Sequence, residues 1–264
     1  MKYFIDFQFL EADVPVRFAG LNVPKRLIKP NNTIQPISLG IVSENGSQYY
    51  AIFKDFNLSE AWSRYQLDSG SLKDIVVNRN YWLRNNVLKP IFKECVEKDS
   101  HWTNKETTLG NWDFTCKNFK YFLNKYGKTN KQIAEEIIGF VTPTNEPHFC
   151  VDLNGKKDIT YQANKRGGTL PEFYGYHCDY EWVAFCWLFG MMNDLPEGFP
   201  KYCIDLKQMF DLKEQDLNNK SAANSVVWNF KDSEDYPKPT NEHHALSDAL
   251  WNYKLYEFLK TLEN

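Results

Sequence analysis

The stretch "KYFIDFQFLE", residues 2–11, is mostly aromatic and aliphatic, with one carboxylate, Asp6, in its middle and a second, Glu11, at its end. This apolar run predicts a buried strand near the start of the chain. Side chains at positions i and i+2 of a strand share a face, so Asp6 and Gln8 are expected to point the same way. An unpaired charge in a buried strand is costly. Asp6 is therefore either a hydrogen-bonded structural carboxylate or a metal ligand.

The remaining sequence predicts a mixed α/β order. Residues 12–33 contain Pro and Gly and are predicted to form a loop, whereas 34–56 predict a β-hairpin that turns at Asn45-Gly46. Helices are predicted over residues 58–66, 81–97, 111–127, 129–141, about 180–192, 206–215 and 243–262. Pro90 is expected to kink or join the second of these, and a capping box from Thr129 to Gln132 is expected to begin the fourth. Further strands are predicted over 172–178 and 201–206, and 142–171 reads as loop-rich. This order predicts an α/β fold with a partly antiparallel sheet flanked by helices.

Length and composition limit the function classes. The chain has 264 residues, 42% of them hydrophobic and 16% aromatic, which indicates a globular protein. We expect a single domain over 1–264 with a helical insertion at about 57–171, although two small domains also fit this length. The net charge of −3 gives no overall attraction to nucleic acid. A polyanionic partner would need a local basic surface or bound cations.

Cysteine usage favours a reducing, cytoplasmic location. The six cysteines include no CxxC pair, so reduced thiols fit better than a disulfide framework or a zinc site. The start of the chain does not resemble a signal peptide, because its apolar run is short and contains Asp6. No apolar stretch approaches the ~20 residues that a membrane span requires. We therefore expect no membrane partner.

Three stretches carry acidic residues where strands end and helices begin. Asp6 lies on the first strand, Asp179 and Glu181 follow the strand near 172–178, and His243 precedes Asp248 by five residues. His243 and Asp248 can converge only if His243 lies before the last helix or in its first turn. Carboxylates that meet at one sheet edge predict a site for Mg²⁺ or Mn²⁺. Two such ions can activate water against a phosphodiester, with a histidine as the general base.

These stretches together resemble the motifs of a known family. The segments "YFIDFQFLE", "YGYHCDYEWVAFCWLFGMMNDLP" and "HHALSDALWN" are similar, in that order, to the three motifs of the DEDDh 3′–5′ exonucleases of the ribonuclease H-like fold. The segment "PISLGIVSENGSQYYAIFKDF" resembles the hairpin that follows the first motif. The resemblance is closest to the branch of the mycobacterial polyadenylate-specific 3′-exoribonucleases. It covers about half of the chain, and residues 57–171 match less diagnostically.

The resemblance implies a metal-dependent 3′–5′ exonuclease that hydrolyses single-stranded RNA, or DNA, with two Mg²⁺ or Mn²⁺ ions. In the third motif, the pattern H-x-A-x-x-D-A is intact at His243, Ala245, Asp248 and Ala249. This spacing assigns the general base to His243 and leaves His244 as the variable position. Members of the family often dimerise, so a homodimer is a further expectation.

The first and second motifs depart from the family pattern. Where the family has Asp-x-Glu, this chain has Asp6 and Gln8, and Glu181 stands where an Asp is expected. Gln8 contributes a neutral amide oxygen in place of a charge, and Asp179 either restores that charge or caps the following helix. Glu181 is either a metal ligand or a first-turn acid favoured by the helix dipole.

Two function classes follow from these departures. The first is an active exonuclease with a weakened metal site. The second is a catalytically impaired nuclease-like domain that acts as a nucleic-acid or protein binding module. In both, Lys165 and Arg166 of "ANKRGGT" are expected to contact phosphates, although such short basic clusters are usually solvated surface.

Overall fold

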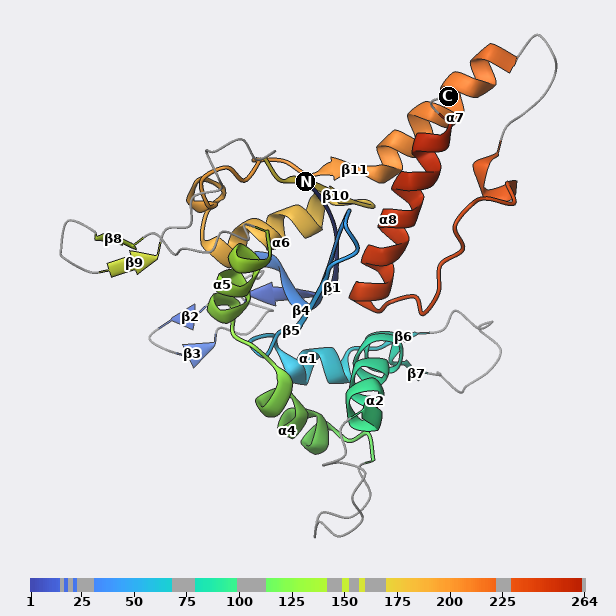
Figure 1. Ribbon diagram of the computed structural model, residues 1–264. Coiled ribbons are helices and arrows are strands. Elements are labelled where there is room, and N and C mark those ends of the chain that lie inside the picture. Colours follow the sequence, from blue (N-terminus) through green and yellow to red (C-terminus); the bar gives the residue numbers. More distant parts are fainter. Residues whose placement is uncertain are drawn as a thin grey trace, which may run out of the picture. The chain divides into compact units, whose positions relative to one another are not determined.

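The computed structural model describes residues 1–14, 17–18, 21–22, 31–67, 79–98, 113–141, 149–151, 157–159, 170–221 and 229–262 (Figure 1). The chain forms two compact units. The first unit comprises Met1–Phe7, Leu39–Ala51 and Thr129–Asn264, and the second comprises Gln8–Ser38 and Ile52–Lys128. The predicted insertion at 57–171 is divided between them at residue 128.

A five-stranded mixed sheet has the order β11-β10-β1-β4-β5. Its strands are β1 (Lys2–Val14), β4 (Asn31–Ser43), β5 (Gln48–Ile52), β10 (Glu172–Gly175) and β11 (Ile204–Asp205). Strand β10 runs parallel to both of its neighbours, β1 and β11. The predicted α/β class with a partly antiparallel sheet is therefore confirmed at this level.

The turn between β4 and β5 confirms the predicted hairpin. Gly46 has a φ of 86°, a left-handed conformation that glycine adopts without the steric cost of a side chain. The Gly46 N–H donates to the Ser43 carbonyl oxygen over 2.9 Å, and the Ser43 N–H donates to that of Ser47 over 2.9 Å. The Asn-Gly pair thus sets the register of the two strands.

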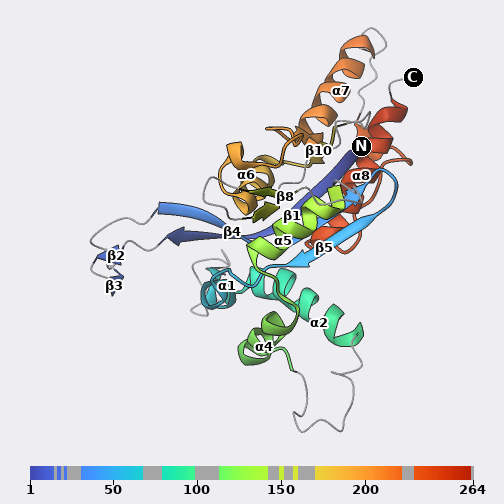
Figure 2. The same cartoon turned by 60° about the vertical axis from the view of Figure 1, so that its left-hand side comes forward.

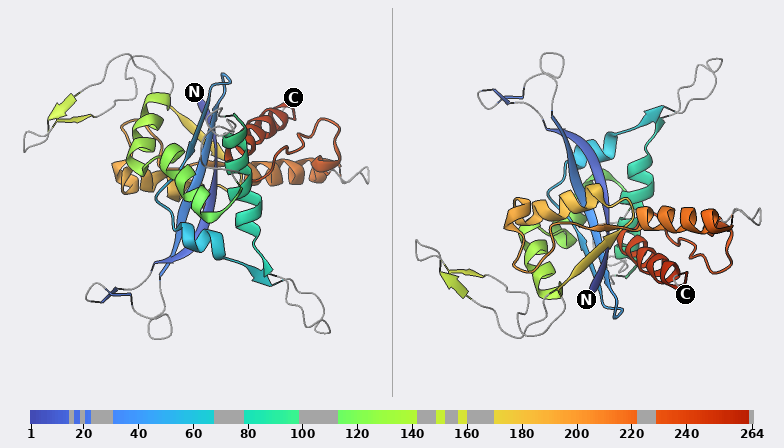
Figure 3. Two further views of the ribbon diagram at one scale, coloured as in Figure 1. Left: turned by 90° about the horizontal axis from the view of Figure 1, so that it is seen from below. Right: turned by 90° about the horizontal axis from the view of Figure 1, so that it is seen from above.

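Alternate residues of β1 and β10 pack on opposite faces of the sheet. Tyr3 stacks on Phe173 with ring centroids 5.6 Å apart, and Phe173 contacts Trp182 of α6 (Asp179–Phe189). On the other face, Phe4 stacks on Tyr174, and both rings contact Tyr256 of α8 (Ala245–Thr261). Figure 3 shows α6 on one side of the sheet and α8 on the other.

Two further helices complete the first unit. Helix α5 (Asn130–Val141) begins with the predicted capping box, because Gln132 Oε1 accepts the Thr129 N–H and Thr129 Oγ1 accepts the Gln132 N–H. The carbonyl oxygen of Val141, the last residue of α5, accepts the Tyr3 hydroxyl proton over 2.9 Å. Helix α7 (Leu206–Ser221) directly follows β11 and extends beyond the predicted 206–215.

Helix α8 is fixed on the sheet by two close contacts. The Asn252 Nδ2 donates a buried hydrogen bond of 2.9 Å to the Ile5 carbonyl oxygen. At the start of the helix, a Cβ placed on Gly40 of β4 would lie only 2.3 Å from the carbonyl oxygen of Ala245. Glycine is therefore required at position 40 for α8 to begin where it does.

The second unit has an aromatic core among its helices α1 (Leu58–Ser63), α2 (Lys89–Lys98) and α4 (Cys116–Tyr126) (Figure 2). Phe92, Phe119 and Phe122 pack with ring centroids 5.3–6.2 Å apart. A π-helical turn over Arg84–Leu88 precedes Pro90. Proline has no N–H for the helical ladder, so the wider turn provides the join predicted at this residue.

Several other local elements of the structure differ from the predictions. The predicted loop at 12–33 is extended wherever it is described, in the end of β1, the start of β4, β2 (Arg17–Phe18) and β3 (Leu21–Asn22). Strands β6 (Gln66–Leu67) and β7 (Arg79–Asn80) form an antiparallel pair, as do β8 (Phe149–Val151) and β9 (Lys157–Ile159). Short 3-10 turns lie over Met192–Asp194 and Phe230–Asp232.

The five cysteines whose side chains are described are all free thiols, and Cys178 and Cys186 are buried. This agrees with the prediction of reduced thiols for those five, while Cys150 lies outside the described side chains. Among the described helices, none combines the length and the apolar content needed to cross a membrane.

Replacing Gly40 with alanine tests the close approach of β4 and α8. We expect Gly40→Ala to lower the free energy of unfolding by about 1–3 kcal/mol, because the new methyl group overlaps the Ala245 backbone. The matched control is Gly139→Ala in α5, where an added Cβ meets no atom within 4 Å, and a gain of ~0.5–1 kcal/mol is expected. Urea unfolding measures both, and equal stabilities would contradict the contact.

Candidate functional site

Strands β10 and β11 end side by side, next to the middle of the longer parallel strand β1. Tyr174 of β10 pairs with Phe4 of β1, and Gly175 pairs with Asp205 of β11. Asp6 follows Phe4 by two residues, and Asp205 is the last residue of its strand. In open α/β sheets, ligands bind at such carboxyl ends. This part of the sheet therefore brings acidic side chains from separate parts of the sequence into one region.

Asp6 and Asp248 belong to the same side of the sheet. Asp6 is two residues after Phe4, whose ring packs on α8, so strand alternation directs both side chains to that helix. The Asn252 amide bonds to the carbonyl oxygen of Ile5, the residue before Asp6. Asp248 precedes Asn252 by four residues, or about one helical turn. This hydrogen bond therefore places α8, which carries Asp248, on the side of β1 from which Asp6 is expected to project.

Asp248 lies in the first turn of α8 and is half-buried. Burial raises the pKa of its carboxyl group to about 7, and the nearby Glu242 raises the pKa further. A hydrogen bond from the His243 backbone N–H acts in the opposite direction and stabilises the charged form. The environment of Asp248 therefore disfavours a free carboxylate and would favour one neutralised by a cation.

Glu181 is the most buried acid of the site, with 8% of its surface exposed. Burial raises the pKa of its carboxyl group to about 7, and the charges of Asp205 and Asp179 add to this shift. Its Oε2 atom is buried and has no hydrogen-bond partner among the described residues. A buried acceptor of this kind costs free energy unless a proton or a cation satisfies it.

The two histidines before α8 have different environments. His243 lies in the turn before the helix, as its convergence with Asp248 requires, and has a left-handed φ of 67°. Residues other than glycine rarely adopt this conformation, which often occurs at functional sites. His244 is buried and stacks on Tyr50, with ring centroids 4.7 Å apart. His244 thus has a packing role, and His243 is placed nearer solvent.

The other predicted site residues are Asp179, Gln8, Lys165 and Arg166. Asp179 is exposed at the start of α6, and Gln8 is half-buried at the first position of the second unit. Lys165 and Arg166 lie outside the described residues. In the described part of the chain, no three His, Cys, Asp or Glu side chains form a ready-made metal cluster. Carboxylates in this part of the sheet would have to adjust to share one ion.

Sequence reasoning missed three residues that shape this region. Asp205 was placed within a strand but not considered as an acid of the site, although it ends the short run "KYCID" just before a helix. That position, an acid between a strand and a helix, was the available signal. His177, with a left-handed φ of 57°, and Asn252, within the last helix, gave no sequence signal.

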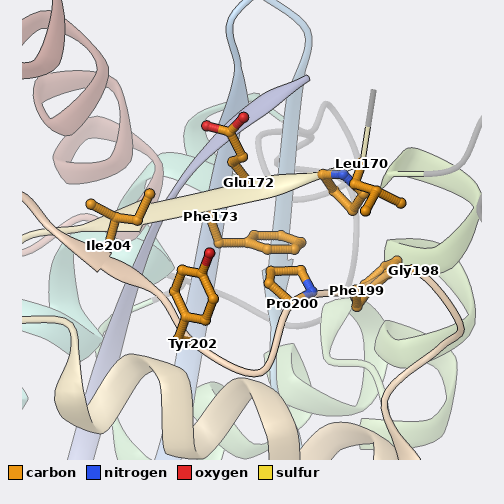
Figure 4. Close-up of a pocket in the computed structure, with 9 residues that line it drawn as sticks. Leu170, Glu172, Phe173, Gly198, Phe199, Pro200, Tyr202 and Ile204 are labelled. Carbon is orange, nitrogen blue, oxygen red and sulfur yellow. The ribbon is translucent and has the colours of Figure 1, made fainter. Parts of the chain in front are cut away.

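A separate hollow of about 550 Å³ lies beside the amino end of β10. It is lined by Leu170, Pro171, Glu172, Phe173, Gly198, Phe199, Pro200, Tyr202 and Ile204. Figure 4 shows Phe173, Pro200 and Tyr202 on one side of the strand and the Glu172 carboxylate on the other. The lining of this hollow is mainly apolar, in contrast to the acidic residues at the carboxyl ends of the strands.

Comparison with models of known protein families finds no match to this chain, and comparison with curated proteins finds none either. The family resemblance seen in the motifs therefore stays a prediction.

The raised pKa of Glu181 has a consequence for stability. Between pH ~4.5 and ~7 the folded protein holds this proton more tightly than the unfolded chain, so stability falls as pH rises through this range. We expect Glu181→Gln to exceed the wild type in unfolding free energy at pH 8, by up to ~3 kcal/mol, and to match it near pH 4. Melting curves across this pH range measure the effect.

The matched control is Glu135→Gln, which changes an exposed glutamate of α5 by the same atoms. It should leave the pH dependence of the melting temperature unchanged. A Glu181→Gln protein that is less stable than the wild type by the same amount at pH 4 and pH 8 would contradict the buried, unpaired carboxylate.

Proposed function

We propose that this chain is a metal-dependent 3′–5′ exonuclease of the ribonuclease H-like fold that acts on single-stranded RNA. The observation that carries the proposal is the Oε2 atom of Glu181, which is buried and has no hydrogen-bond partner among the described residues. Glu181 lies in the first turn of α6, shortly after β10, and Asp205 ends the neighbouring strand β11. Burying a carboxylate without a partner is unfavourable, and a divalent cation is one partner that removes the penalty.

The donor set fits Mg²⁺ or Mn²⁺. Asp6, Glu181 and Asp248 supply carboxylate oxygens, which these hard cations prefer. When bound, such ions activate water and stabilise the charge that develops on the phosphodiester. Burial disfavours the charged form of Glu181 and Asp248, so cation binding and their deprotonation are linked.

His243 is suited to accept the proton of the attacking water. It stands in the turn before α8, and its backbone N–H bonds to the Asp248 carboxylate. This contact ties the position of His243 to an expected metal ligand.

Gln8 weakens the site relative to the family pattern. Its amide oxygen carries no charge, so Asp6, Glu181 and Asp248 together supply three negative charges against two divalent ions. Mg²⁺ demands near-ideal octahedral geometry. We therefore expect the less demanding Mn²⁺ to support activity better than Mg²⁺. A loss of chemistry with binding retained is the competing account, and Gln8 is the residue that favours it.

The proposal is tested with single-stranded RNA labelled at its 5′ end, incubated with Mn²⁺, Mg²⁺ or EDTA. The expected result is stepwise shortening from the 3′ end with release of nucleoside 5′-monophosphates, faster with Mn²⁺ and absent with EDTA. A 3′-blocked RNA should persist. Equal decay of 5′-blocked and 3′-blocked RNA, or no decay with either metal, would contradict an exonuclease. Binding of RNA without hydrolysis would establish the binding module instead.

The variants His243→Ala and His244→Ala distinguish chemistry from packing. We expect His243→Ala to lower the turnover rate by about 10²–10⁴-fold with little change in RNA affinity. His244→Ala should mainly lower the melting temperature, because its side chain is buried against Tyr50. Rates are compared at a temperature where both variants remain folded. Equal losses of turnover would show that the base is wrongly assigned.

A further inference from the structure

Asp205 uses only one of its two carboxylate oxygens in its hydrogen bonds to described residues. Its Oδ1 atom accepts three backbone N–H groups, from Lys207 over 2.7 Å, from His177 over 3.3 Å and from Gln208 over 3.4 Å. The bonds from Lys207 and Gln208 cap the start of α7. Within the part of the chain that the structure describes, all three bonds end on Oδ1. The Oδ2 atom thus remains available to a further partner.

Glu181 stands close to Asp205. The bond from His177 ties Asp205 to the turn that leads into α6, where Glu181 occupies the first turn. Gly175, at the start of that turn, pairs directly with Asp205. The charge of Asp205 acts on Glu181 more strongly than that of Asp179. Two carboxylates are therefore neighbours in a region that is mostly closed to water around Glu181.

The positive charge that would balance this pair is not supplied by the adjacent lysine. Lys207 follows Asp205 by two residues, but its ammonium group bonds to the carboxylate of Asp211. Like charges at close range repel, and the repulsion is stronger where burial lowers the local dielectric. Glu181 Oε2, buried and without a hydrogen-bond partner in the described residues, is the oxygen that most needs a cation.

We propose that Asp205 is a divalent-cation ligand, sharing with Glu181 an ion held between Asp205 Oδ2 and Glu181 Oε2. Mg²⁺ and Mn²⁺ sites commonly use one or two carboxylates and complete their coordination with water. Asp205 supplies the negative charge that Gln8 does not, so the site regains a fourth carboxylate from a different strand. This inference rests on the proposed function, because Glu181 belongs to that site.

The structural account of Asp205 is that it caps α7 and does nothing more. The variant Asp205→Asn separates the two accounts, because an asparagine side chain caps a helix about as well as aspartate does. The substitution keeps the Oδ1 acceptor for the three N–H groups and removes the charge. The matched control is Asp216→Asn, which removes the same charge from an exposed position of α7, where Asp216 pairs with Lys220.

Mn²⁺ binding to the full chain is measured by electron paramagnetic resonance of the free ion and by the metal-dependent rise in melting temperature. We expect Asp205→Asn to weaken Mn²⁺ binding at least ~10-fold and to reduce the rise in melting temperature, with little change in the melting temperature without metal. Asp216→Asn should bind Mn²⁺ like the wild type. Asp248→Asn, measured in parallel, reports on the expected ligand from α8.

The outcomes separate this inference from the proposed function. Wild-type Mn²⁺ affinity in Asp205→Asn overturns the inference, and RNA hydrolysis that depends on Asp248 would still support the nuclease. Weaker Mn²⁺ binding in Asp205→Asn, in a wild type that never hydrolyses RNA, supports the cation site and overturns the nuclease. A wild type that binds no Mn²⁺ overturns both. A fall in metal-free melting temperature with unchanged Mn²⁺ affinity assigns Asp205 to capping alone.

Discussion

The hydrogen bond from Asn252 Nδ2 to the Ile5 carbonyl oxygen is the constraint on which the candidate site depends. It joins residues 247 positions apart in the sequence and is buried. A buried amide left unsatisfied costs about 1–3 kcal/mol, so this bond strongly favours one rotation of α8 on the sheet. In that rotation Asp248, one turn before Asn252, is carried on the helix that packs against the side of β1 from which Asp6 projects. The close contact between Gly40 and the Ala245 backbone limits where the helix can begin.

Two acids of the candidate site, Glu181 and Asp248, stand in buried and half-buried positions. Glu181 and Asp248 both have a pKa raised to about 7, chiefly by burial. Keeping such groups in a stable protein has a cost, and structural packing alone would favour apolar replacements. Buried acids with raised pKa values are typical of metal and catalytic sites. Buried acids of this kind are the basis of the proposed cation site.

Much of the fold followed from local patterns in the sequence. The apolar run at 2–11, the Asn45-Gly46 turn and the capping box at Thr129 each have one favoured local structure, and all three are present. The full length of α7 and the two-residue strands of the pairs β2–β3 and β6–β7 were not predicted. Strands this short are too brief for hydrophobic periodicity to show.

Part of the candidate site could likewise be predicted from local sequence patterns. Asp6, Glu181, His243 and Asp248 were predicted as site residues because Asp6 lies on the first strand and the other three lie where a helix begins. Asp205 has the same placement, but its strand is only two residues long and gave a weak signal. The burial of Glu181 and the left-handed backbone of His243 are tertiary properties. No spacing rule applied to a single sequence reveals them.

The central claim is that the carboxylates of the candidate site bind divalent cations, and crystals grown in Mn²⁺ test it most directly. Anomalous scattering locates the ions independently of any assumption about chemistry. The account predicts at least one peak within coordination distance of carboxylate oxygens from Asp6, Glu181 or Asp248, and loss of that peak in crystals of Asp248→Asn or Glu181→Gln. Saturating Mn²⁺ with no peak at these carboxylates would contradict it.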